Sequence, residues 1–242
     1  MKLLVTLALV TALIPSLATS QENLLDGIVA FYGFSGNAND ESGNGHHGIV
    51  DGPLLTIDRF GTQGLAFEFD GFDDIIHILD DPHFDTVDEF SLSAWIRPAA
   101  RKTQTILHKG TFASPPYSLS LSGTGDFVLS LKPSGIAIQV RAHGYEINIW
   151  TFVAATWDGN RARLYVNGEE VASEVAPGTI YHYNAPLRIG TRLQMPANSF
   201  EGVLDEITVY ERALTADEVM ELGNGLVSVE YTSWSQVKSL YR

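Results

Sequence analysis

Short apolar runs separated by turn residues recur along most of the chain. In several of these runs apolar and polar residues alternate, which is the period of a strand with one buried face. Phe127, Leu129 and Leu131, for example, fall on one face of their run. Strands are therefore predicted at residues 28–34, 64–69, 74–78, 90–97, 105–109, 117–122, 127–132, 136–142, 150–157, 161–166, 169–175, 187–191 and 202–211.

Two of these segments carry more specific signals. In the first, Ile136, Ile138 and Val140 alternate with small or polar residues, so we expect them to share one face. The second, residues 150–157, is apolar on both faces. This pattern indicates a central strand that is covered on both sides.

A hairpin and a helix complete the pattern. The runs on either side of Asn167-Gly168 should form a hairpin, because this dipeptide suits a type I′ turn. A helix is predicted after Thr215, an N-cap with Glu218 as its capping-box partner, and Gly223 is placed to end it. Many strands, tight turns and one short C-terminal helix predict an all-β fold, in which two antiparallel sheets close on one core as a sandwich or jelly roll.

The first 20 residues predict export. Lys2 is followed by an apolar run, and Ala18 and Ser20 are small residues that flank the cleavage point of a secretory signal peptide, residues 1–20. The run is short and interrupted for a membrane span, and no second long apolar run follows. We therefore expect a secreted or extracytoplasmic protein of the cell envelope, with no membrane span in the mature chain.

Charge and cysteine content exclude several classes of function. The 242-residue chain has a formal net charge of −14, and removal of residues 1–20, which hold one Lys and no acid, makes it −15. Such a surface repels nucleic acid and anionic membranes. The absence of cysteine excludes disulfides, thiolate catalysis and Cys-based zinc sites. The remaining length suits one large β domain.

Six phrases occur together in the order and spacing of one family: AFYGFSGNANDESGNGHHG, GLAFEFDGFDDIIHI, FSLSAWIRP, WTFVAATWDGNRARLYVNGEEVAS, PLRIGT and FEGVLDEITVYERALTADEV. In these phrases the chain resembles the LamG-like jelly-roll domains of the concanavalin A-like lectin/glucanase group. The resemblance covers residues 26–223 and leaves residues 224–242 as a C-terminal tail. It implies a sandwich of two curved antiparallel sheets. It implies fold more firmly than function, because this fold hosts lectins, adhesion modules, glycosidases and lyases.

The loop at residues 37–48 is rich in oxygen ligands, and calcium takes roughly six to eight of them. Related jelly rolls often hold a structural calcium where the first loop meets the last long strand. By that resemblance, Asp40 and Asn44 would bind calcium together with Asp205. The alternative is an Asx-rich turn in which Asp40 caps backbone N–H groups.

Two other patterns offer weaker signals of chemistry. His46 and His47 are adjacent and point to opposite sides of an extended chain, so their spacing does not predict a zinc site. Glu68 and Asp70 would share a strand face, as a pair of glycosidase carboxylates does. Because Gly71 follows directly, the segment fits better as a turn between two strands.

Sugar binding requires aromatic faces for stacking and planar polar groups for hydroxyls. Arg141, His143 and Tyr145 alternate at the end of one predicted strand, the residue types that a lyase or a sugar site uses. The segment 178–194 supplies further residues of these types. The candidate ligand-binding residues are Tyr145, Tyr181, His182, Tyr183 and Arg192.

The leading hypothesis is therefore an exported, non-catalytic module that binds carbohydrate or a cell-surface or extracellular partner, with calcium as a structural pin. One alternative is a glycoside hydrolase or polysaccharide lyase on the same fold. Another is a structural envelope or adhesion module. The three hypotheses differ in whether they predict binding, turnover or neither.

Overall fold

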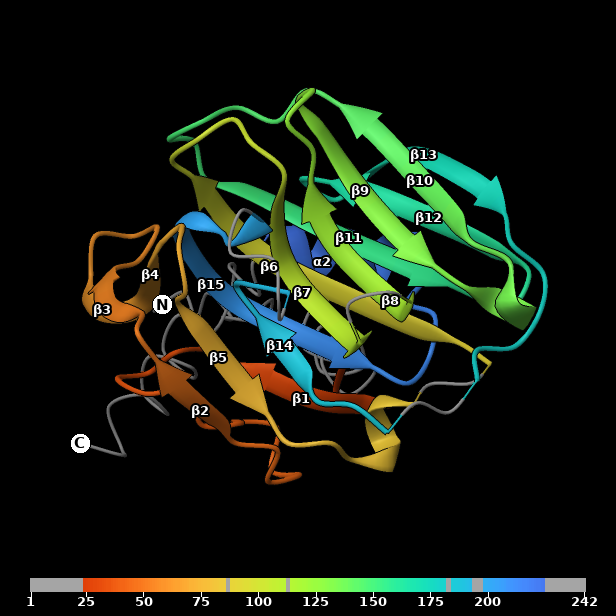
Figure 1. The fold of residues 1–242 in the computed structure, drawn as a ribbon, viewed down its shortest axis with the longest axis horizontal. Helices are drawn as coiled ribbons and strands as arrows, with labels where there is room; N and C mark the ends of the chain where they lie inside the picture. The colour runs from red at the N-terminus through yellow and green to blue at the C-terminus, as the bar shows by residue number, and fades with distance from the viewer. Residues whose placement is uncertain (1–23, 86–87, 112–113, 182–183, 193–197, 225–242) are drawn as a thin grey trace, which may run out of the picture.

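The computed structural model describes residues 24–85, 88–111, 114–181, 184–192 and 198–224. The expected signal peptide and residues 225–242 of the expected tail lie outside these ranges. Fifteen strands of the described chain form two antiparallel sheets (Figure 1). Within the same ranges, no helix combines the length and the apolar character that crossing a membrane would require.

The larger sheet has eight strands in the order β13-β12-β11-β6-β15-β4-β3, with β1 paired to β15. The smaller sheet has seven strands in the order β10-β9-β8-β7-β14-β5-β2. The strands of the larger sheet are β1 (Ile28–Tyr32), β3 (Leu54–Ile57), β4 (Gln63–Asp70), β6 (Phe90–Pro98), β11 (Thr151–Trp157), β12 (Arg161–Val166), β13 (Glu169–Val175) and β15 (Glu201–Tyr210). Those of the smaller sheet are β2 (Gly48–Asp51), β5 (Ile75–Ile78), β7 (Gln104–Thr111), β8 (Ser114–Leu121), β9 (Asp126–Leu131), β10 (Ile138–His143) and β14 (Leu187–Ile189).

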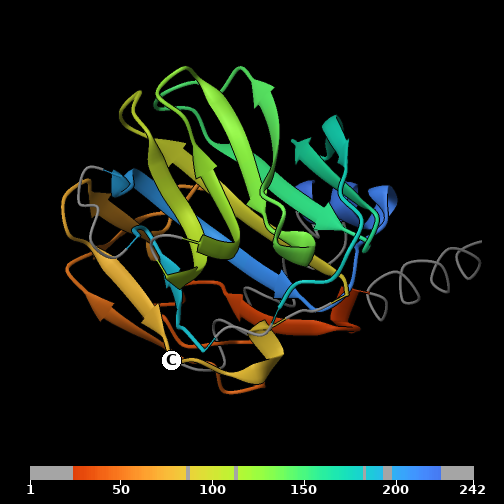
Figure 2. The same cartoon turned by 45° about the vertical axis from the view of Figure 1, so that its right-hand side comes forward.

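The two sheets are curved and pack face to face around one large apolar core (Figures 1 and 2). Alternation along the strands supplies this core, because every second side chain of a strand points to the same face. In β9, Phe127, Leu129 and Leu131 are at most 2% exposed, as their spacing predicted. This arrangement confirms the predicted two-sheet jelly-roll sandwich.

One helix, α2 (Ala216–Gly223), packs against the outer face of the larger sheet. The predicted capping box is present, since Thr215 Oγ1 accepts a hydrogen bond from Glu218 N at 3.3 Å and Glu218 Oε2 accepts one from Thr215 N at 2.7 Å. Every residue of β11 is buried, because the core covers one face and this helix helps to cover the other. The apolar cluster under the helix contains Leu24, Phe152, Ala154, Tyr165, Tyr210, Leu214 and Val219.

All the predicted strands are present, with ends displaced by a few residues. The hairpin is confirmed, with φ of 51° at Asn167 and 86° at Gly168, as a type I′ turn requires. The pattern missed β2 and β3, which are short edge strands and mostly exposed. The prediction for Ile136 is wrong, because β10 begins at Ile138 and Ile136 lies outside it, 65% exposed.

A buried ion cluster holds one end of the sandwich together. Lys109 at the end of β7 is fully buried, and its Nζ lies 2.6 Å from Asp80 Oδ1 and 3.2 Å from Asp85 Oδ1. The same Nζ donates a hydrogen bond to the carbonyl oxygen of Ala185 at 2.7 Å. The two aspartates flank the 3₁₀ turn η1 (Pro82–Phe84). The ammonium group therefore joins β7, η1 and the segment before β14.

Substitution Lys109→Met should destabilise the fold strongly. The Asp85 side chain is 3% exposed, so the variant buries a carboxylate without the Lys109 ammonium group. We expect the free energy of unfolding to fall by about 3–5 kcal/mol in urea titrations. Lys102→Met is the control, because Lys102 Nζ pairs with Glu201 at 2.9 Å near the surface, and it should cost less than about 1 kcal/mol. Equal losses in the two variants would contradict this interpretation of the cluster.

Candidate functional site

A row of polar side chains crosses the outer face of the smaller sheet. Its members are paired across neighbouring strands, and paired residues of a sheet point to the same face. Their exposure falls from Gln139, which is exposed, to His108 and Arg188, which are buried. From β10 to β5 the row consists of Gln139, Ser130, Ser118, His108, Arg188 and His77.

At its exposed end the row joins a hydrogen-bonded group of five side chains, which we call the β9–β10 network: Asp126, Ser130, Gln139, Arg141 and His143. Gln139 Nε2 donates to Ser130 Oγ at 3.1 Å, and Arg141 Nη2 donates to Gln139 Oε1 at 2.9 Å. Asp126 Oδ1 lies 2.8 Å from His143 Nδ1, and its Oδ2 lies 3.5 Å from Arg141 Nη1. The Arg141 side chain is 48% exposed and that of His143 is 74% exposed, so both can reach a ligand.

Hydrogen bonds keep Asp126 ionised. The Thr124 hydroxyl is the largest cause, and together with His143 and Ser122 it lowers the pKa of Asp126 to about 2. Thr124 Oγ1 donates to Asp126 Oδ2 at 2.7 Å, and Ser122 Oγ donates to the same oxygen at 3.0 Å. The carboxylate therefore stays negative at neutral pH and orients the imidazole and the guanidinium beside it.

Tyr145 does not join the network. It is 1% exposed, and its hydroxyl donates to the carbonyl oxygen of Ser122 at 3.1 Å. Burial raises the pKa of this tyrosine. The prediction of Tyr145 as a stacking residue for sugar is therefore contradicted, because its ring belongs to the core. Of the alternating trio, Arg141 and His143 face outward and Tyr145 faces inward.

Two of the other predicted ligand-binding residues, Tyr181 and Arg192, lie in the described part of the chain. Tyr181 is 63% exposed in the segment before β14. Arg192 follows β14 at its opposite end and is partly buried, and this burial lowers the pKa of its guanidinium. His182 and Tyr183 lie outside the described residues. Tyr181 and Arg192 therefore lie on opposite sides of β14 along the chain.

Asp40, the first predicted calcium ligand, caps its own loop. Its Oδ1 accepts hydrogen bonds from Phe31 N at 3.0 Å and Ser42 N at 2.9 Å, and its Oδ2 accepts one from His46 N at 3.0 Å. Burial opposes ionisation of this carboxyl, but the hydrogen bonds from Ser42, Phe31 and His46 lower its pKa. Both oxygens are thus used by backbone N–H groups, as the Asx-turn interpretation expects.

The other two predicted calcium ligands also have partners. Asn44 Nδ2 donates to the carbonyl oxygens of Ile28 at 2.8 Å and Val29 at 3.0 Å, which ties the loop to β1. Asp205 Oδ2 lies 3.6 Å from Arg59 Nη1. A guanidinium at this distance opposes binding of a cation. The three side chains therefore do not fit a calcium shell, and the calcium site stays a prediction.

The acidic segment at the end of β4 forms a turn. Glu68 and Asp70 both face solvent, as predicted from their spacing. Asp70 Oδ1 accepts from Phe72 N at 2.8 Å, and Asp74 Oδ2 accepts from Asp70 N at 2.7 Å. Asp70, Asp73 and Asp74 lie with carboxylate oxygens within 4.8 Å of one another. The turn joins β4 in one sheet to β5 in the other, so the Asp70 and Asp74 carboxylates have a structural role.

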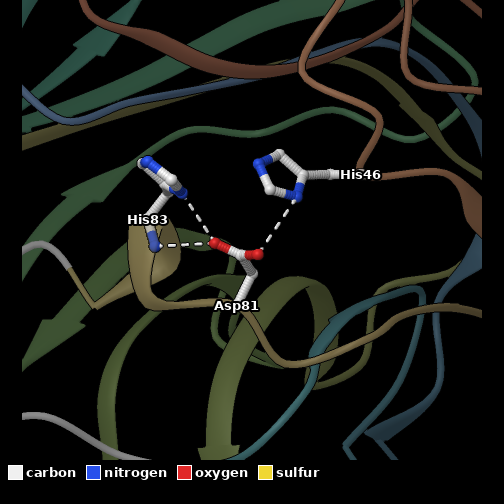
Figure 3. Close-up of side chains that lie close together, drawn as sticks. All are labelled: His46, Asp81 and His83. Carbon is white, nitrogen blue, oxygen red and sulfur yellow. Dashed lines mark hydrogen bonds and ion pairs between the residues drawn. The ribbon is translucent and has the colours of Figure 1, made fainter.

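A cluster that the spacing of the histidines did not predict lies at the other edge of the smaller sheet (Figure 3). His46 Nδ1 lies 4.0 Å from Asp81 Oδ2, and His83 Nδ1 lies 2.7 Å from Asp81 Oδ1. His47 turns away, and its Nδ1 accepts a hydrogen bond from Asp40 N at 3.1 Å. The adjacent histidines point apart, as expected, but one of them meets a histidine distant in sequence.

Sequence comparison relates the chain to one family. A family model described as the concanavalin A-like lectin/glucanases superfamily matches residues 70–220. No curated protein sequence shows significant similarity to the chain.

Solved structures with the same fold include toxin and glycosidase domains. The binding domain of Paraclostridial Mosquitocidal Protein 1 has a TM-score of 0.70 and 21% identity, over 84% of this chain and 53% of that one. Domain 4 of AbnA, a GH43 extracellular arabinanase from Geobacillus stearothermophilus solved with arabinotriose, has a TM-score of 0.65 and 22% identity, over 81% and 98%. The receptor-binding domain of botulinum neurotoxin type G has a TM-score of 0.64 and 17% identity, over 82% and 51%. The chain thus spans about half the length of the toxin domains it matches, and at these identities the likeness shows the fold alone.

The carboxyl group of Asp126 should titrate near pH 2, well below the ordinary value of 3.8. Because the folded pKa lies below the unfolded one, ionisation of this group favours the folded state above about pH 4, and that contribution is lost as pH falls toward 2. Thr124→Ala removes the largest cause and should raise the pKa. A carbon NMR titration of the carboxyl measures it, and an ordinary value in the unmodified protein would contradict the network.

Thermal unfolding with calcium and in metal-free buffer tests the predicted calcium set. Since Asp40 is used by backbone N–H groups and Asp205 faces Arg59, we expect the same midpoint in both buffers. Asp40→Ala should lower the midpoint equally in both. A rise with calcium that disappears in Asp205→Asn would support the calcium site instead.

Proposed function

The chain belongs to the concanavalin A-like lectin/glucanases superfamily, and we propose that it acts as an exported, non-catalytic binding module. Its ligand is a glycan, free or carried by a cell-surface or extracellular partner. The observation that carries the proposal is the β9–β10 network on the outer face of the smaller sheet. The solved neighbours support it, since they include toxin binding domains and an arabinanase domain solved with arabinotriose.

The network supplies the chemistry that sugar hydroxyls require. A hydroxyl both donates and accepts hydrogen bonds, and the amide of Gln139 and the hydroxyl of Ser130 offer both functions. Arg141 adds planar donors at a fixed orientation, and Asp126 adds acceptors. These side chains already bind one another, at 3.1 Å for Gln139–Ser130 and 2.9 Å for Arg141–Gln139. A ligand therefore meets groups that have lost part of their rotational freedom beforehand, which lowers the entropic cost of binding.

The negative charge of the whole chain disfavours acidic glycans as ligands. A formal net charge of −14 creates a negative potential that repels polyanions. Arg141 in the network is already neutralised in part by Asp126 at 3.5 Å. We therefore favour a neutral glycan over an acidic polysaccharide.

The hydrolase and lyase alternatives have weaker support. Glu68 and Asp70 share a solvent-facing side of β4, but Asp70 caps the following turn through Phe72 N at 2.8 Å. A lyase that used Arg141, His143 and Tyr145 would need all three at one surface, and Tyr145 is 1% exposed. A purely structural envelope module predicts neither binding nor turnover.

Binding to a panel of neutral glycans, followed by calorimetry on any ligand found, tests the proposal. Arg141→Ala should weaken binding about tenfold or more, because a hydrogen bond to a charged group contributes about 1.5–3 kcal/mol. Gln139→Ala should weaken binding about twofold to tenfold, because a hydrogen bond between neutral groups contributes about 0.5–1.5 kcal/mol. Arg163→Ala is the matched control, since Arg163 pairs with Asp158 at 2.7 Å on a strand of the other sheet. It should leave the affinity unchanged.

Two results would overturn the proposal. The first is a glycan panel that stays blank for a folded protein. The second is equal weakening by Arg141→Ala and Arg163→Ala, which would place the ligand elsewhere. Turnover of a polysaccharide that is lost in Glu68→Gln would favour the hydrolase alternative.

A further inference from the structure

The cluster of His46, Asp81 and His83 is assembled by the pairing of β2 with β5. Gly48 pairs with Ile78 in this register, so the chain just before β2 lies beside the chain just after β5. His46 precedes β2, and Asp81 and His83 follow β5. Figure 3 shows the two imidazole rings on either side of the Asp81 carboxylate.

Contacts with neighbouring residues hold His46 in place on one side of the cluster, and Asp81 and His83 on the other. On one side, the Tyr32 hydroxyl donates to the carbonyl oxygen of His46 at 2.7 Å, and the His46 ring lies 4.8 Å from that of Phe84, measured between centroids. On the other side, η1 is fixed by Phe84, which is fully buried, and by the Lys109 ion cluster. Donor groups on such a supported frame keep their geometry, as a metal site requires.

The separations suit a small, four-coordinate ion. One ligand atom from each of the three residues lies within 4.8 Å of the others. With metal–ligand bonds of about 2.0–2.2 Å, neighbouring atoms of a tetrahedral zinc site lie about 3.3–3.6 Å apart. The observed 4.0 Å from His46 Nδ1 to Asp81 Oδ2 and 2.7 Å from His83 Nδ1 to Asp81 Oδ1 lie on either side of this range. Modest side-chain rotations would therefore bring the three atoms around one ion.

We propose that His46, Asp81 and His83 form a binding site for one divalent transition-metal ion of the zinc class. Two imidazole nitrogens and one carboxylate suit zinc, whereas calcium and magnesium take oxygen ligands. Three protein ligands leave a fourth position open to water or to a ligand atom. The negative charge of the chain favours attraction of the cation.

The simpler interpretation is that Asp81 only caps η1. Its Oδ1 accepts from His83 N at 3.0 Å and lies 2.7 Å from His83 Nδ1, which a capping role explains. Capping does not require His46, whose Nδ1 faces the other oxygen, Oδ2. The proposed site is also separate from the β9–β10 network, because β2 and β10 are opposite edges of the sheet. The two proposals can thus fail independently.

Calorimetric titration of zinc chloride into the full chain, stripped of metal beforehand, tests the site. We expect one equivalent to bind to the unmodified protein, and bound Co²⁺ should give the visible absorption bands of a tetrahedral site. His83→Ala is the first variant, since this side chain is 66% exposed and its loss should not disturb folding. It should weaken zinc binding at least tenfold and abolish the tetrahedral spectrum, and Asp81→Asn should do the same.

His143→Ala is the matched control. His143 Nδ1 lies 2.8 Å from Asp126 Oδ1, and this exposed pair resembles that of His83 and Asp81. Among the described residues, however, no third histidine or carboxylate lies close enough to complete a metal site with it. This variant should bind zinc as the unmodified protein does. The proposal is overturned if the unmodified chain binds no stoichiometric zinc, or if His83→Ala and His143→Ala weaken binding equally.

Discussion

The two sheets bury their apolar faces against each other, and this burial decides where the polar side chains of the molecule can lie. In most strands it places alternate residues in one core, as Phe127, Leu129 and Leu131 show in β9, whereas the edge strands β2 and β3 are mostly exposed. Polar chemistry is then confined to the outer faces and to the rims where strands end. On the larger sheet, α2 and the apolar cluster beneath it cover part of the outer face. The outer face of the smaller sheet keeps its polar row, and this is where the proposed glycan site lies.

Where strands end and the chain turns, polar groups are buried as well as apolar ones. Lys109 is fully buried between Asp80 and Asp85, an arrangement that is stable only because the charges are paired. The same ion cluster fixes η1 and so holds Asp81 and His83 in place. The contacts that stabilise this end of the sandwich therefore also position the proposed metal ligands. By contrast, the Asp40 carboxylate accepts hydrogen bonds from backbone N–H groups of β1 and of its own loop.

The alternating trio shows how a local pattern can mislead at the end of a strand. Arg141 and His143 lie on β10 and face outward, in agreement with their period. The strand ends at His143, and Gly144 has a φ of 123°, a conformation that residues other than glycine rarely adopt. The chain turns there, and the ring of Tyr145 enters the core instead of continuing the row. Periodicity predicts a side only as long as the strand continues.

Residue types and neighbours a few positions away were enough to predict every described strand except β2 and β3, the hairpin at Asn167-Gly168, the capped helix and the absence of thiol chemistry. The sequence also suggested the two-sheet sandwich through the resemblance of its phrases to one family. Which side chains distant in sequence come into contact could be seen only in the folded chain. The pairing of β2 with β5 brings His46 to Asp81, and Asp205 meets Arg59. Such contacts depend on the register of strands that are distant in sequence, and local periodicity carries no information about that register.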